Sequence, residues 1–415
     1  MKSITTATSP NTERDDFWLA LKLLFFPTKW RKGVATKKLL NEFKSWLPVK
    51  HGFLFESGRG ALWGILKSLN LAPDSEILLQ AYTCVAVPDP ILWAGLKPVY
   101  VDIREETFNM SVQDLGKKIT KNSRVLIIQH TFGLPAEIDE IMQIAKKYNL
   151  IVIEDCAHAL GAKYHDKYVG TFGDFAFFSF GRDKVISGVW GGVVVTSNDS
   201  YASNLEMVRE GLSMSTNLWV LQQLLHPITF GIIRPTFQWF GRFLLAFLKL
   251  IRFISLAVYR SELEGEKPQF IGSQMPNALA ILALNQFKKL SRFNDHRKEI
   301  ASIYTKELTE INVVLPFDSV KSEQIYLRYT LKTQYADKLL SDGAREGMYL
   351  GDWYNNVITP KGVNLSKVKY EIGCCPVAEN VASKSINLPT HINTSINDAE
   401  RISKFIKKQL NEYKN

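Results

Sequence analysis

The stretch from residue 151 to 192 constrains the fold more than any other part of this 415-residue chain. It opens with an apolar run, Ile151 to Ile153, that ends in two carboxylates, Glu154 and Asp155. A parallel strand that is buried on both faces has this pattern, and open α/β sheets bind ligands at the carboxyl ends of such strands. Strand and helix patterns alternate up to about residue 200, so the sequence predicts an α/β fold with a mostly parallel sheet.

A glycine-rich turn follows this strand and contains Ser179 and Lys184, five residues apart. Pyridoxal phosphate needs a lysine for its Schiff base and an acid opposite its pyridinium nitrogen. Its phosphate needs hydroxyl and backbone N–H donors. In this interpretation Lys184 is the Schiff-base lysine, Asp155 keeps the ring nitrogen protonated and Ser179 binds the phosphate. The spacing alone leaves a second interpretation open, in which Lys184 is a solvated loop lysine and Asp155 caps a helix.

Three ordered motifs in this stretch resemble the DegT/DnrJ-type (StrS-like) sugar aminotransferases, which are fold-type I pyridoxal phosphate enzymes. The resemblance implies the roles given above for Lys184, Asp155 and Ser179. It also places His158 close to the cofactor ring. It implies a seven-stranded-type sheet in a large lobe and a smaller α+β C-terminal lobe. The motifs are EDCAHALGA (154–162), VGTFGD (169–174) and FSFGRDK (178–184).

The turn that contains Gly58, Arg59 and Gly60 resembles the family's phosphate-binding turn at a helix N-terminus. Glycine allows close backbone approach, and the free N–H groups and the helix dipole favour an anion. Arg59 stands where many relatives have threonine, so it either adds a charged phosphate contact or points away. An ordinary capped helix is the alternative for this turn.

Two further strand ends predict substrate contacts, at Tyr82 and at His130. Relatives often have a cofactor-stacking aromatic residue after the threonine that corresponds to Thr83, and this chain has Cys84 there. Tyr82 or His158 is then expected to supply the stacking. A structural histidine is an equally open interpretation of His130.

The charge and the cysteines limit the class of protein. The four cysteines form no C-x-x-C pair, which predicts a reduced, cytosolic setting without a disulfide framework or a metal site. The N-terminal 16 residues have no apolar core, so no secretory signal is expected. A net charge of +10 indicates an anionic partner such as a membrane surface or a phosphorylated substrate. No nucleic-acid motif accompanies the charge, so we expect no nucleic-acid partner.

Three apolar segments lie outside the family pattern, at residues 17–32, 211–233 and 242–260. The second contains no Asp, Glu, Lys or Arg. In the third, apolar residues favour bilayer insertion by about 3 to 7 kcal/mol, while Lys249 and Arg252 oppose it by about 5 to 7 kcal/mol. A helix lying in the membrane interface is therefore predicted for 242–260, with its Lys and Arg reaching the headgroups. The alternatives are packing on the protein's own core for 17–32 and a buried interface between subunits for the later segments.

Residues 272–275 replace an Asn and an Arg that relatives contribute to their partner's site, and a homodimer with a shared site is still expected.

The expected organisation has five parts. The parts are an N-terminal arm (1–34), a large cofactor-binding lobe (35–211), an apolar helical insertion (212–266), a return helix (267–300) and a small lobe (301–415).

These features together predict an aminotransferase that moves an amino group from an amino acid, often glutamate in this family, to a keto-sugar. We expect it in cell-surface polysaccharide or glycoconjugate biosynthesis, on the inner face of the cytoplasmic membrane, with a membrane-bound substrate or glycosyltransferase nearby. One alternative is a sugar dehydratase, but such relatives often replace the lysine with histidine, and this chain has Lys184. The others are a membrane-associated regulatory or scaffold protein that keeps the fold, and an enzyme acting on a non-sugar substrate.

Overall fold

A computed structural model of the chain describes residues 3–7, 9–251, 253–309, 311, 313–317 and 319–413. Its main sheet has nine strands, of which seven form a mostly parallel core and two are short additions at one edge. Among the seven, one strand runs antiparallel to both neighbours, and this arrangement confirms the predicted α/β fold-type I lobe. The order across the sheet is β12 (Ser213–Met214), β13 (Ser273–Gln274), β2 (His51–Phe55), the antiparallel β11 (Gly192–Thr196), β10 (Phe175–Ser179), β7 (Ile151–Asp155), β6 (Ser123–Gln129), β3 (Glu76–Gln80) and β5 (Lys97–Val101).

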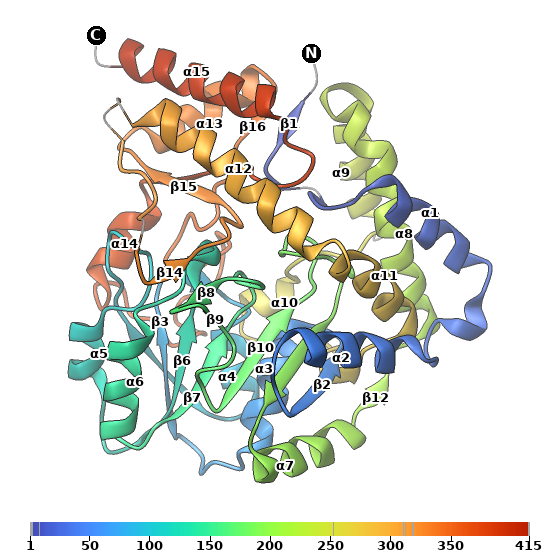
Figure 1. The fold of residues 1–415 in the computed structure, drawn as a ribbon, viewed down its shortest axis with the longest axis vertical. Helices are drawn as coiled ribbons and strands as arrows, with labels where there is room; N and C mark the ends of the chain where they lie inside the picture. Colours follow the sequence, from blue (N-terminus) through green and yellow to red (C-terminus); the bar gives the residue numbers. More distant parts are fainter. Residues whose placement is uncertain are drawn as a thin grey trace.

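Helices cover both faces of this sheet (Figure 1). Because both faces are covered, successive residues of a strand are buried on opposite sides, as Val152 and Ile153 are. This explains why the strands are continuous apolar runs and not alternating ones. One face carries α3 (Gly58–Ser68), α4 (Pro88–Trp93) and α7 (Asp199–Glu210), and the other carries α2 (Ala35–Trp46), α5 (Val112–Lys118), α6 (Ile138–Lys147) and α11 (Asn277–Phe287).

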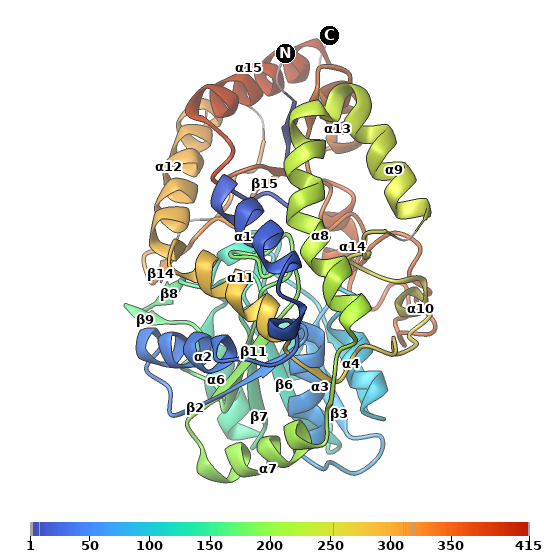
Figure 2. The same cartoon turned by 90° about the vertical axis from the view of Figure 1, so that its right-hand side faces the viewer.

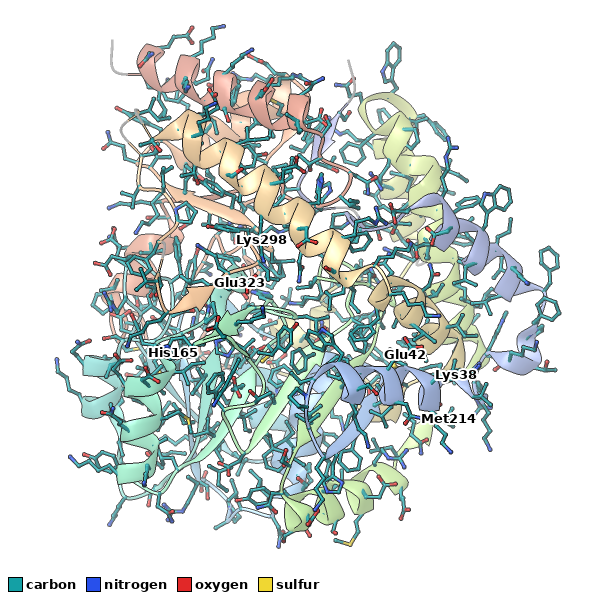
Figure 3. The ribbon with its side chains drawn as sticks, in the orientation of Figure 1. Lys38, Glu42, His165, Met214, Lys298 and Glu323 are labelled. Carbon is teal, nitrogen blue, oxygen red and sulfur yellow. The ribbon has the colours of Figure 1, made fainter. Side chains whose placement is uncertain are left out.

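The smaller lobe lies at the top of Figure 1, where both chain ends are found. Helix α12 (Leu290–Leu308) runs into it without a break, so the boundary predicted at residue 300 falls inside a helix. Lys298 of this helix lies next to Glu323 (Figure 3), and the two form an ion pair. The lobe also contains β14 (Ser322–Glu323), β15 (Tyr329–Lys332), α13 (Ala336–Arg345), β16 (Met348–Tyr349), α14 (Pro376–Ala382), β18 (Ser385–Leu388) and α15 (Ile396–Glu412), while β17 (Ile358–Thr359) pairs with β4 (Thr83–Cys84) of the large lobe.

The N-terminal arm joins the two lobes. Strand β1 (Ile4–Thr5) pairs with β16, and α1 (Arg14–Leu24) packs beside α11. Trp30, one of the aromatic residues of the predicted interfacial run, is buried, and its indole N–H donates to the Leu23 carbonyl at 2.7 Å. Trp18, Phe25 and Phe26 are exposed. The run 17–32 therefore divides between core packing and an exposed aromatic edge; Met1, Lys2 and Thr8 of the arm lie outside the described residues.

The segment predicted as an apolar insertion folds on one flank of the molecule, beside α1 (Figure 2). Helix α8 (Asn217–Ile233) buries Val220, Leu224, Phe230 and Ile233, so much of the uncharged stretch packs on the protein itself. After it come η3 (Arg234–Thr236), η4 (Phe237–Gly241), α9 (Arg242–Leu250) and the short α10 (Arg260–Leu263).

The single helix predicted for residues 242–260 is wrong. Helix α9 ends at Leu250, and the chain then turns inward, with Ile254 and Ser255 buried. The physical reason is a polar anchor, because the Arg182 guanidinium donates to the carbonyl and the hydroxyl of the buried Ser255. Arg252, which entered the insertion estimate, lies outside the described residues.

Within the described parts of the chain, no helix has both the length and the apolar character needed to cross a bilayer.

Candidate active site

Three strand ends meet at one edge of the sheet and carry polar residues. Asp155 ends β7, Ser179 ends β10, and Ser57 follows β2. Strand β10 lies next to β7, and Gly192 at the start of β11 pairs with both Ser179 and Phe55. Because β2, β10 and β7 point the same way, their carboxyl ends form the usual ligand-binding edge of an α/β sheet.

The N-terminus of α3 forms an anion cradle at this edge. Ser57 is its N-cap, and the Ser57 hydroxyl accepts from the Gly60 N–H at 2.9 Å. The first N–H groups of a helix have no intrahelical acceptor, and the dipole adds partial positive charge there. A Cβ on Gly58 would lie 2.9 Å from the Cβ of Ser179, so only glycine lets the helix start approach the Ser179 hydroxyl this closely. A phosphate is the kind of ligand that such a cradle binds.

A cavity of about 560 Å³ opens above the strand ends, and Asp155 and Lys184 both line it. Burial raises the pKa of Asp155, although the Ala157 N–H donates to its carboxylate at 3.0 Å. Burial also lowers the pKa of Lys184, so its amine loses a proton more readily than a solvated lysine does. Six predicted residues line this one cavity: Gly58, Arg59, Asp155, His158, Ser179 and Lys184.

Glu154 fixes the glycine-rich turn behind the site. Its carboxylate accepts from the backbone N–H groups of Gly170 and Gly173 at 2.7 and 2.8 Å. His130 is fully buried and holds the same carboxylate through Nε2 at 3.2 Å. Its Nδ1 accepts from the Ala136 N–H, so the ring proton lies on Nε2 and both nitrogens are engaged. His130 lies outside the described lining of the cavity, and this placement favours the structural interpretation of that residue.

Tyr82 and Gly60 also lie outside the described lining. The Tyr82 ring is buried edge-to-face against Tyr354, with the ring centres 5.2 Å apart. A Cβ on Gly60 would come within 2.1 Å of the Glu56 carboxylate, so glycine is required there for packing. The geometry therefore gives both residues a supporting role behind the site.

Arg59 lines the cavity, but its side chain is held by the segment that follows α9. The guanidinium forms an ion pair with the buried Glu262 of α10 and donates to the Ala257 carbonyl at 2.7 Å. It also lies 5.0 Å from the centre of the Trp190 ring. Of the two roles predicted for Arg59, the structure therefore matches the one in which the side chain points away from the phosphate.

The sequence patterns did not single out two residues of the small lobe that line the same cavity as Lys184, namely Arg328 and Trp353. The Trp353 ring centre lies 4.9 Å from Lys184 Nζ and 5.1 Å from the His158 ring centre. The buried Arg328 guanidinium lies 5.8 Å from the same indole. An arginine inside the apolar run 325–331 was an available signal for Arg328, whereas Trp353 follows an irregular loop with no recognisable pattern.

Segments distant in sequence complete the wall of the cavity. Residues 254–258 line it, and so do Thr6, Ala7 and Ser9 of the N-terminal arm. Asn11 of the same arm donates to the Lys184 carbonyl at 2.6 Å, so the arm also holds the backbone of the lysine in place.

Pyridoxal phosphate fits this set of residues. The Gly58–Ser179 cradle would hold its phosphate, Asp155 would face its ring nitrogen, and Lys184 would hold it covalently. His158 and Trp353 supply flat surfaces beside the ring position. The cavity volume lies within the usual range for a small-molecule or cofactor site.

This chain is similar in sequence to a known family of aminotransferases. The model of the DegT/DnrJ/EryC1/StrS aminotransferase family matches residues 16–223 and 252–407, and leaves 224–251 unmatched. GDP-perosamine synthase from Escherichia coli O157:H7 is 27% identical over 370 residues, covering 86% of this chain and 85% of that protein. UDP-N-acetyl-3-dehydro-alpha-D-glucosamine 3-aminotransferase from Acidithiobacillus ferrooxidans is 25% identical over 363 residues, covering 87% of this chain and 85% of that protein.

A solved structure shares the fold along the whole chain. Helicobacter pylori PseC, an aminotransferase involved in the biosynthesis of pseudoaminic acid, superimposes with a TM-score of 0.77 at 18% identity. The match covers 99% of this chain and 100% of that one. The family match on both sides of residues 224–251 places the chain in the DegT/DnrJ/EryC1/StrS family of pyridoxal-phosphate-dependent aminotransferases.

Proposed function

We propose that this enzyme transfers an amino group from an amino acid, with glutamate as the donor, to a keto-sugar in cell-surface polysaccharide or glycoconjugate biosynthesis. One observation carries the proposal: Lys184 and Asp155 line one cavity together with the Gly58–Ser179 cradle. The similarity to enzymes named for nucleotide-sugar amination supports the sugar as the amino acceptor.

Lys184 is the group that moves the proton in this proposal. Bound pyridoxal phosphate would draw electrons away from the carbon that carries the amino group, which makes the C–H proton there acidic. A lysine acts as a base only when it is neutral, and burial favours the neutral form of Lys184. Asp155 supplies the negative charge that keeps the ring nitrogen protonated.

Arg328 is our candidate for binding the carboxylate of the amino donor. It lies against the indole that also contacts Lys184, and burial lowers its pKa. Its Nη1 donates to the Thr6 carbonyl, while its Nε has no hydrogen-bond partner within the described residues. A buried cation whose donors are not all paired is costly, and an anionic substrate group would offset that cost. A dicarboxylic donor such as glutamate has suitable charge.

The test uses the purified holoenzyme, glutamate and a panel of keto-sugars on different carriers. Borohydride treatment should give a stable cofactor adduct on Lys184, and Lys184→Ala should lose both the adduct and amino transfer. Lys121→Ala, which changes an exposed lysine, should keep both. An adduct on any other lysine would show that the assignment of Lys184 is incorrect.

We further propose that the enzyme is a homodimer that works at a membrane surface. The support is an exposed apolar face on and next to α9, which we call the α9 face, and an overall charge of +10. An amphipathic helix with aromatic residues and flanking Lys or Arg binds anionic interfaces without crossing them. The competing occupant is a second copy of the chain. The α9 face comprises Trp239, Phe240, Phe243, Phe247, Leu250 and Ile251.

A further inference from the structure

His226 of helix α8 is a buried polar residue to which the chemistry proposed above gives no role. It is 1% exposed and lines the same cavity as Lys184. The Ser9 hydroxyl lies 2.6 Å from its Nε2, and the Phe230 ring packs against it, with the ring centres 4.3 Å apart. Its Nδ1 is buried and has no hydrogen-bond partner among the described residues. The protein therefore engages one nitrogen of the ring and leaves the other without a partner.

Trp190 and Arg182 line the same cavity, and each has a nitrogen in the same condition. The Trp190 Nε1 and the Arg182 Nε are buried and lack partners in the described part of the chain. The Arg182 guanidinium lies 5.9 Å from the centre of the Trp190 ring. A buried polar atom without a partner costs free energy, and a ligand that supplies the partner offsets this cost. These nitrogens and His226 Nδ1 therefore favour a ligand with several polar groups, as a nucleotide-linked sugar has.

The charge state of His226 indicates which polar group it binds. Burial, together with the charge of Arg182, holds the pKa of His226 well below its usual value, so the ring is neutral. A neutral imidazole has one N–H and one acceptor nitrogen, and Nδ1 is the donor in one tautomer and the acceptor in the other. A hydroxyl group can pair with Nδ1 in both tautomers because it donates and accepts, whereas a phosphate oxygen only accepts. A hydroxyl is therefore the group that suits this position.

We propose that His226 is a specificity-determining residue that hydrogen-bonds a hydroxyl of the nucleotide-linked keto-sugar through Nδ1. His226 falls within residues 224–251, which the family model does not match, so the motifs shared with the family give it no role. The inference rests on the proposed sugar aminotransferase function and adds a residue that selects the acceptor. The hydroxyl belongs either to the sugar or to the pentose of its carrier, and the two sources present the same chemistry to the ring.

The test compares three substitutions of His226 in the holoenzyme, with glutamate as the donor and 4-keto-6-deoxyhexoses linked to GDP, UDP or dTDP as acceptors. The side-chain amide of Asn reaches the position of Nδ1, and that of Gln reaches the position of Nε2. His226→Phe and His226→Gln should raise KM for the acceptor by at least about tenfold, because a hydrogen bond to the substrate is lost. His226→Asn should keep this KM within about threefold of the wild-type value, because a polar atom remains at Nδ1. The kcat and the KM for glutamate should be unchanged in all three variants.

Inhibition by GDP, UDP or dTDP alone identifies the source of the hydroxyl. An inhibition constant that rises in His226→Phe would place the hydroxyl on the pentose, and an unchanged constant would place it on the sugar.

A purely structural role, in which His226 only holds Ser9, would give the reverse pattern. His226→Gln would then behave as the wild type, while His226→Asn and Ser9→Ala would both lose activity. That pattern, or an unchanged acceptor KM in His226→Phe, would overturn the proposal. The absorbance change with glutamate alone tests the donor step without any acceptor. Wild-type protein that completes this step but aminates none of the three acceptors would contradict the proposed acceptor and, with it, this role of His226.

Discussion

At the scale of single residues, the site depends on charges that the fold keeps out of water. Asp155 is buried and Lys184 is half-buried, and burial raises the pKa of Asp155 and lowers the pKa of Lys184, which favours the neutral form of each. Such shifts cluster where proteins perform acid–base chemistry. Binding of the cofactor would give each group a further partner.

The first prediction concerns Asp155. Asp155→Asn should keep the fold but lower kcat by at least about a hundredfold at saturating cofactor, because the ring nitrogen loses its anionic partner. Steady-state kinetics with added cofactor and circular dichroism check this. Asp183→Asn, at a neighbouring cavity position, serves as a matched control with a smaller expected effect. Unchanged turnover in Asp155→Asn would mean that this carboxylate does not face the ring nitrogen.

The second prediction concerns Arg328. Arg328→Gln should raise KM for glutamate by at least about tenfold, because a charge-assisted hydrogen bond to the donor carboxylate is lost. Arg328→Lys should restore part of the affinity, since it restores the charge without the two-pronged geometry. The KM for the keto-sugar should stay the same, and a change confined to that value would assign Arg328 to the acceptor instead.

At the scale of elements, the chain from α9 to α10 is fastened to the cofactor lobe by two arginines. Arg182 holds Ser255, and Arg59 holds Glu262. The side chains of Arg59 and Glu262 are 11% and 0% exposed. The breaking of a buried pair is costly because one charge remains without a partner.

We therefore expect Glu262→Ala to lower the free energy of unfolding by about 3 kcal/mol or more. Urea denaturation followed by far-UV circular dichroism would measure this free energy. Glu266→Ala, four residues further on and exposed, should change stability by less than about 0.5 kcal/mol. Equal effects of the two substitutions would show that the Arg59–Glu262 pair does not stabilise the fold.

The α9 face gives a prediction for membrane binding. Phe243→Ser together with Phe247→Ser should abolish flotation with liposomes that contain anionic lipid, because the helix loses the apolar area that it would bury. Ile372→Ser removes a similarly exposed apolar residue from the small lobe and should leave flotation unchanged. Point substitutions are preferable to deletion of residues 215–262, since α8 buries four large apolar side chains in the core. Wild-type protein that never floats and sediments as a dimer through this face would favour the subunit interface.

At the scale of the whole molecule, stability should depend on pH through Asp89. This carboxylate is fully buried, neither oxygen has a hydrogen-bond partner among the described residues, and burial raises its pKa to about 8. A raised carboxyl pKa means that the folded protein binds the proton more tightly than the unfolded chain. The stabilisation is complete below the unfolded pKa, near 4, and is lost as the pH rises towards 8.

Asp89→Asn should therefore become more stable than the wild type as the pH rises from about 5 to about 8, by up to a few kcal/mol. Urea unfolding across this pH range measures the difference. Asp74→Asn, at an exposed turn, should follow the wild-type curve at every pH. Parallel curves for Asp89→Asn and the wild type would mean that Asp89 ionises in the folded protein as it does in water.

The sequence by itself located the part of the cavity that contains Asp155, Ser179 and Lys184. Asp155, Ser179 and the turn at Gly58 sit at the ends of parallel strands, and such ends must meet at one edge of the sheet. Lys184 follows Ser179 by only five residues, so local chain geometry keeps it near that edge. These positions depend on the strand period and on short turns, which can be recognised from the order of residues.

The other part of the cavity could be located only from the tertiary structure. Arg328, Trp353 and residues 254–258 come from distant parts of the chain, and tertiary packing brings them to the cavity that Lys184 also lines. The apolar pattern of 242–260 fits a helix, but the Arg182 guanidinium hydrogen-bonds the polar groups of the buried Ser255, and the helix ends before them. Likewise, the roles of His130 and Gly60 depend on the buried carboxylates of Glu154 and Glu56 beside them. A buried charge needs a polar or charged partner, and that partner can come from a distant part of the chain. Its position therefore cannot be read from local periodicity.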